Sequence, residues 1–134
     1  MIVLDRDILV KLRNSDEAVV RHLQQYSTEE WTITSHVAWE SFQHYSSRPD
    51  MLREYHHLQS IFDRVLAFTA DTALEAAYLD EKLREQDVGL DAVDLLNLAT
   101  AHEAGGTLVT HNSQDFDRPA LHELVDVDVV YTGN

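Results

Sequence analysis

The chain has 134 residues, 44% of them hydrophobic, and this length and composition predict one domain with one hydrophobic core. It contains no cysteine, which excludes disulfides, thiolate metal sites and a cysteine nucleophile. The formal charge of -14 argues against non-specific nucleic-acid binding, which draws on basic surface. Two explanations of the charge stay open: a salt-rich cytoplasm that screens it, or a basic partner.

No membrane association is expected from the sequence. A run of about 18 apolar residues, which a transmembrane helix requires, is absent. The first residues enter a strand pattern directly and do not resemble a signal peptide. We therefore expect a cytoplasmic protein.

Strand and helix patterns alternate along the chain. Short apolar and β-branched runs predict strands near 2–4, 31–34, 65–68 and 107–110, with an alternating run at 127–131 typical of an edge strand. The first strand is apolar on both faces, which suits the middle of a parallel sheet. Between the strands, helical spacing predicts the remaining elements; one example is the stripe Met51, Leu52, Tyr55, Leu58, Phe62 and Val65. The alternation predicts an α/β fold, one domain over residues 1–134, with a mostly parallel sheet of four to five strands flanked by helices.

The stretch 91–116 organises the functional interpretation. It begins with a helix that is apolar around most of its circumference, which predicts a buried helix carrying one acid, Asp94. The pair Gly105 and Gly106 ends this helix, and the strand 107–110 follows. A polar loop, 111–116, then carries Asp115 at the carboxyl end of that strand, where ligands collect in open α/β sheets.

Four carboxylates are predicted to converge at this edge of the sheet. Asp5 ends the first strand, Glu40 lies on the helix that leaves the second, and Asp94 lies on the helix that enters the fourth. Asp115 follows the fourth strand. Clustered carboxylates repel one another unless a hard divalent cation neutralises them, and Mg²⁺ or Mn²⁺ prefers such oxygen ligands. A cation there lowers the pKa of a water and stabilises charge on a phosphodiester.

With these residues in place, the chain resembles the PIN domains of VapC type, the toxin ribonucleases of toxin–antitoxin pairs. The resemblance spans essentially the whole chain and rests on the segments 2–10, 94–101 and 108–116, with Glu40 between them. It implies a Mg²⁺- or Mn²⁺-dependent endoribonuclease with metal-binding acids at Asp5 and Asp94. Glu40 would position metal or activate water, and the last acid falls near 112–115. A homodimer and a VapB-like antitoxin are implied as well.

The residues beside these acids differ in part from the family pattern. Arg6 stands where the family usually has Thr or Ser, and it either contacts a phosphate or pairs with an acid. Asn112 stands where many relatives carry Asp. The fourth acid of the family pattern is then either Asp115 or absent from this chain. Thr110 and Asn112 are expected to orient an acid or a water by hydrogen bonding, and His111 is a candidate for touching substrate.

Other interpretations of the same residues remain open. Asp5 could serve as a helix cap, and Asp94 could be an acid favoured by the helix dipole. Glu40 could be a solvated surface residue, and Asp7 could be an acid at the start of a helix rather than a ligand. The pair Asp5 and Asp7 also fits a phosphatase with an aspartate nucleophile, although Ile8 and Leu9 replace the expected Gly-Thr turn. A catalytically degenerate PIN-fold binding module is the non-enzyme alternative.

Overall fold

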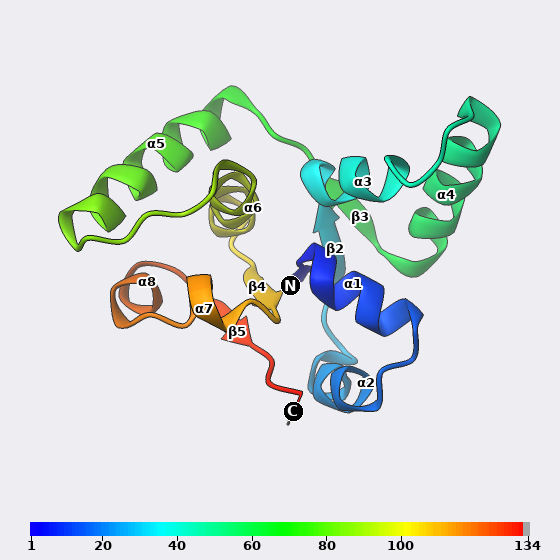
Figure 1. Ribbon diagram of the computed structural model, residues 1–134, viewed down its shortest axis with the longest axis horizontal. Helices are drawn as coiled ribbons and strands as arrows, with labels where there is room; N and C mark the ends of the chain where they lie inside the picture. Colours follow the sequence, from blue (N-terminus) through cyan, green and yellow to red (C-terminus); the bar gives the residue numbers. More distant parts are fainter. Residues whose placement is uncertain (133–134) are drawn as a thin grey trace.

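The computed structural model describes residues 1–132, in which strands and helices alternate (Figure 1). The elements in chain order are β1 (Ile2–Leu4), α1 (Arg6–Arg13), α2 (Glu17–Leu23), the 3₁₀ helix η1 (Gln24–Tyr26), β2 (Trp31–Thr34), α3 (Ser35–Phe42), α4 (Arg48–Ile61), β3 (Arg64–Leu66), α5 (Ala70–Glu85), α6 (Ala92–Glu103), β4 (Thr107–Thr110), α7 (Ser113–Phe116), α8 (Pro119–Leu124) and β5 (Val127–Val129). The short helix α7 lies within the segment predicted as a loop. None of the helices in this part of the chain combines the length and the apolar character needed to cross a membrane.

The strands form one five-stranded sheet in the order β3-β2-β1-β4-β5, and every neighbouring pair is parallel. This confirms the predicted α/β fold, with β1 in the middle and β5 at an edge. The strand β3 begins and ends earlier than the predicted run 65–68, and β5 stops before residue 131.

Helices cover both faces of the sheet, as Figure 1 shows, with α1 to α4 on one side and α5, α6 and α8 on the other. The strand β1 supplies both cores because its side chains alternate: Ile2 and Leu4 pack in the first, Val3 in the second. All three are fully buried. Parallel strands with helices on both faces place every strand's carboxyl end at one edge of the sheet.

The apolar stripe predicted for α4 is wrong in two respects. The helix ends at Ile61, so Phe62 and the residues after it fall outside it. Leu52 and Tyr55 are 46% and 42% exposed, whereas Glu54 is only 5% exposed. Glu54 is buried because Arg13, on α1, donates a hydrogen bond of 2.6 Å to its carboxylate. The covered face of α4 therefore combines the core residue Leu58 with Glu54, whose carboxylate is paired with Arg13.

The prediction of a buried helix at 92–103 holds for only part of α6. Residues Asn97 to Ala101 are buried, whereas the first turn, with Asp94, lies closer to the surface. Asn97 accepts a hydrogen bond of 2.5 Å from the Thr34 hydroxyl at the end of β2. That bond ties the helix to the sheet, so the first turn of α6 projects toward the edge where the strands end.

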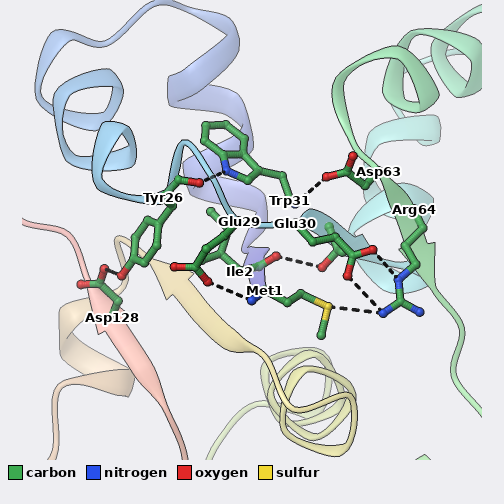
Figure 2. Close-up of polar contacts among 10 residues, drawn as sticks. Met1, Ile2, Tyr26, Glu29, Glu30, Trp31, Asp63, Arg64 and Asp128 are labelled. Carbon is green, nitrogen blue, oxygen red and sulfur yellow. Dashed lines mark hydrogen bonds and ion pairs between the residues drawn. The ribbon is translucent and has the colours of Figure 1, made fainter.

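At the opposite edge, where the strands begin, acidic side chains have donors within reach (Figure 2). The amino group of Met1 lies 2.9 Å from Glu29, and Arg64 pairs with Glu30 at 3.1 Å. Asp63 accepts a hydrogen bond of 2.8 Å from the backbone N–H of Trp31. Glu29, Glu30 and Asp63 are therefore each partnered.

Candidate active site

Acids from three elements meet at the edge of the sheet where the strands end. Asp5 follows β1, and Thr110 is the last residue of β4, its neighbour in the sheet. The helix α6 leads into β4 from the opposite direction, so its N-terminal turn, with Asp94, returns to this edge. Glu40 comes from α3, which begins directly after β2.

Asp5 is buried and held by two hydrogen bonds. Its Oδ1 accepts from the backbone N–H of Arg6 at 2.8 Å, which makes it the N-cap of α1. Its Oδ2 accepts from the Thr110 hydroxyl at 2.8 Å. Burial, followed by the charge of Asp7, raises the pKa of Asp5 to about 7, although both hydrogen bonds act in the other direction. The helix-cap interpretation is therefore correct, and the carboxyl also faces other acids.

Asp94 lies in the first turn of α6, as a residue favoured by the helix dipole would. Burial raises its pKa to about 6, and the charges of Asp115, Asp91, Glu40 and Asp7 add to the rise. Asp94 also raises the pKa of Asp5. All four predicted acids are thus electrostatically coupled, and Asp94 is the residue that links them.

Asp7 is a neighbour that the sequence interpretation assigned only to the start of the helix. It does lie in the first turn of α1, yet its charge raises the pKa of Asp5, Glu40 and Asp94. Both its carboxylate oxygens accept from the backbone N–H of His111, at 3.1 and 3.2 Å. Burial raises the pKa of Asp7 itself despite these bonds. The sequence does show that Asp7 lies two residues from Asp5, which is a signal for a shared site. It does not show the contact with His111, because that contact forms only in the folded chain.

Glu40 is half-buried on α3, and not fully solvated as the alternative interpretation held. Burial raises its pKa; the Arg6 charge lowers it, and the Asp7 charge raises it. The guanidinium of Arg6 does not pair with Glu40. It contacts the His44 ring instead and forms no ion pair within residues 1–132.

Asp115 and Asn112 hold each other at the rim of the site. Asn112 is the N-cap of α7, accepting from the Asp115 backbone N–H at 3.2 Å and donating from its amide to the Asp115 carboxylate at 2.9 Å. The backbone N–H of Asn112 donates to the Thr110 hydroxyl at 3.1 Å, and that hydroxyl donates to Asp5. The ring of His111 instead points to Thr132, at 3.2 Å. One hydrogen-bonded chain thus connects Asp115 to Asp5.

The two edges of the sheet differ electrostatically. At the edge in Figure 2 the acids have cationic, N–H or O–H partners, whereas here carboxylates raise one another's pKa and none of the ion pairs of residues 1–132 includes one of them. Within the described residues, no three His, Asp or Glu side chains already stand at the spacing of a metal site. The donor set is nevertheless all carboxylate oxygen, which is the chemistry that hard divalent cations bind.

Comparisons with known proteins agree with the observed fold. A model of the PIN domain family matches residues 2–121. One similar structure, at TM-score 0.74 and 20% identity over 98% of this chain and all of the other, is VapBC2 from Rickettsia felis bound to a DNA fragment from their promoter. Others are FitAcB from Neisseria gonorrhoeae (0.75, 20%, 96% of each chain) and a toxin–antitoxin complex from Klebsiella pneumoniae (0.73, 21%, 98% of each). No curated protein matches by sequence.

Proposed function

Since the chain belongs to the PIN domain family, as its sequence predicted, we propose that it is the toxin nuclease of a VapBC-type pair and that it hydrolyses RNA. The observation that carries the proposal is the coupling of Asp5, Glu40, Asp94 and Asp115 at the carboxyl edge of the sheet. Perturbed pKa values from burial together with like charges are characteristic of functional sites.

The proposed cofactor is Mg²⁺ or Mn²⁺. Asp5 and Asp94 are the proposed ligands, with Asp115 completing the set and Glu40 and Asp7 beside them. A divalent cation favours the ionised form of each carboxylate, which opposes the burial and repulsion that raise their pKa values. When bound, such an ion makes a water more acidic and stabilises negative charge on a phosphodiester.

The chain's own residues supply orientation and proton transfer in this proposal. The Arg6 backbone N–H and the Thr110 hydroxyl fix the two oxygens of Asp5. Asn112 fixes Asp115 in the same way, through its amide. Glu40 is the proposed general base, since its raised pKa suits a carboxylate that accepts a proton from the attacking water.

We further propose a cytoplasmic homodimer inhibited by a VapB-like antitoxin. The support is the set of complexes that the similar structures represent, together with exposed apolar side chains on α3 and α4. Trp39 is 52% exposed, beyond what a core residue would show, and Leu52 and Tyr55 are similarly accessible. Exposed aromatic residues of this kind are enriched at protein interfaces.

The test is cleavage of a structured RNA pool by the purified protein with Mg²⁺ or Mn²⁺ over a range of KCl. An EDTA control and the variants Asp94→Asn and Asp71→Asn run beside it. Asp71 is an exposed acid in the first turn of α5, so its variant removes the same charge away from the site. Cutting that needs metal and is reduced at least about 100-fold only by Asp94→Asn supports the proposal. No cutting in any salt, with no Mn²⁺ binding by calorimetry, refutes it and leaves the degenerate binding module.

A further inference from the structure

A pocket of about 160 Å³ lies between α1, α3 and α4, beside the acidic site. Among its lining residues are Arg6, Arg13, Asn14, His44, Tyr45 and Glu54. Its volume exceeds that of a few waters and falls below the range of about 300 Å³ and more that drug-sized ligands occupy. It therefore fits a group about the size of a phosphate.

The charge of this pocket runs against that of the chain as a whole. The chain has only 10 Lys and Arg against 24 acids, yet two arginines and a histidine line this pocket, with Glu54 as the one acid among the lining residues that the structure describes. Arg6 contacts His44 and forms no ion pair in residues 1–132. A polyanion approaching a chain of charge -14 needs such a local excess of positive charge.

Arg13 is held in place for this task by a buried partner. Glu54 is 5% exposed and accepts from one terminal nitrogen of Arg13 at 2.6 Å. The hydrogen bond to Glu54 is the main cause that raises the pKa of Arg13. A guanidinium carries five N–H donors, so Glu54 and the neighbouring Tyr45 engage only part of the fork, and about a third of the side chain is exposed. The ion pair thus orients the Arg13 guanidinium and leaves part of it able to donate to a ligand.

The pocket adjoins the carboxylate cluster through two pairs of consecutive residues. Arg6 lines the pocket and follows Asp5; Ser41 lines it and follows Glu40. A phosphate bound in this pocket would be a neighbour of the phosphate at the proposed cleavage site on the same RNA strand.

We propose that this pocket is a phosphate-binding subsite, in which Arg6 and Arg13 hold a backbone phosphate of single-stranded RNA beside the scissile one. The proposal rests on the nuclease function proposed above. Fork-shaped guanidinium groups bind phosphate oxygens through paired hydrogen bonds, which a lone positive charge does not reproduce.

The experiment measures binding of a short single-stranded RNA of mixed sequence by fluorescence anisotropy, as a function of salt, in an Asp94→Asn background. The variants are Arg6→Gln and the double variant Arg13→Gln with Glu54→Gln, which avoids leaving a buried carboxylate unpaired. Each should weaken binding on the order of tenfold and reduce the slope of log K against log salt by about 0.7, the value for one phosphate contact on a single strand. Glu54→Gln alone keeps a carbonyl that accepts from Arg13 and removes the opposing charge, so it should keep or tighten binding.

Arg64→Gln is the matched control, because Arg64 lies at the opposite edge of the sheet (Figure 2). Its slope should equal that of the parent.

If the wild type cuts RNA but both pocket variants keep the parent slope, the subsite is refuted while the nuclease stands, and a carboxylate-bearing protein segment becomes the better occupant. If the wild type neither binds nor cuts RNA, both proposals fail. Thermal unfolding followed by circular dichroism checks the double variant, and Arg6→Gln, which removes no buried ion pair, carries the test if that variant does not fold.

Discussion

Replacing Asp5 by Asn should stabilise the metal-free protein, and increasingly so as the pH rises. The pKa of Asp5 lies at about 7 in the folded chain against the usual 3.8. The folded state therefore holds its proton longer than the unfolded state does, and folding stability falls as the pH rises between these two values. The full difference corresponds to about 4 kcal/mol at about 1.4 kcal/mol per pH unit.

Asparagine keeps the contacts of Asp5 while removing the charge. Its carbonyl can accept from the Arg6 backbone N–H and cap α1, and its amide can donate to the Thr110 hydroxyl. The assay is urea denaturation in EDTA at about pH 5.5 and about pH 8, above the isoelectric region where solubility falls. The variant's advantage should grow by up to about 2 kcal/mol between those two conditions, because about 1.5 units of the interval lie below the folded pKa.

Asp71→Asn is the control, since it removes one negative charge from an exposed position of the same highly charged chain. Its effect should differ little between the two pH values. A pH-independent difference between Asp5→Asn and wild type, or a variant less stable than wild type at about pH 8, would show that the burial and repulsion inferred for Asp5 are wrong.

Two further substitutions test the surroundings of the site and the end of α6. Thr110→Val removes the hydroxyl that donates to Asp5, so calorimetry should find Mn²⁺ affinity lower by about tenfold, and an unchanged affinity would contradict the orienting role. Gly105→Ala should lower the free energy of unfolding by about 1 kcal/mol because Gly105 has a φ of 77°, where a side chain is strained. Gly89→Ala is its control: a Cβ at either glycine meets nothing within 4 Å, and only Gly105 has a positive φ, so equal effects would contradict this explanation.

The fold and most of the acidic cluster could be predicted because they follow from local patterns. Short apolar runs located the strands, and the alternation with helices required them to be parallel. Asp5 and Asp115 then fall at one edge simply because each follows a strand of that sheet. Asp94 required one more step, the reversal of direction along α6.

The residues that were misjudged depend on partners far away in the sequence. Asp7 looks like an ordinary helix-start acid until the backbone N–H of His111, 104 positions later, is found to donate to it. Glu54 looks like a surface residue until it meets Arg13, 41 positions earlier. Helical periodicity shows which residues share a face of a helix. It does not show which charged residue of that helix is buried by pairing with a residue of another helix.

The distribution of partners between the two edges separates what holds the fold from what is available for chemistry. At the edge where strands begin, Glu29, Glu30 and Asp63 each have a cationic or N–H partner, so these charges contribute to the fold. At the other edge, Asp5 and Asp94 meet like charges, and each pKa records an interaction that destabilises the ionised, metal-free protein. Binding of a cation that relieves that repulsion is favoured by it. We therefore expect ligand binding to depend most on the acids that are least favourable for folding.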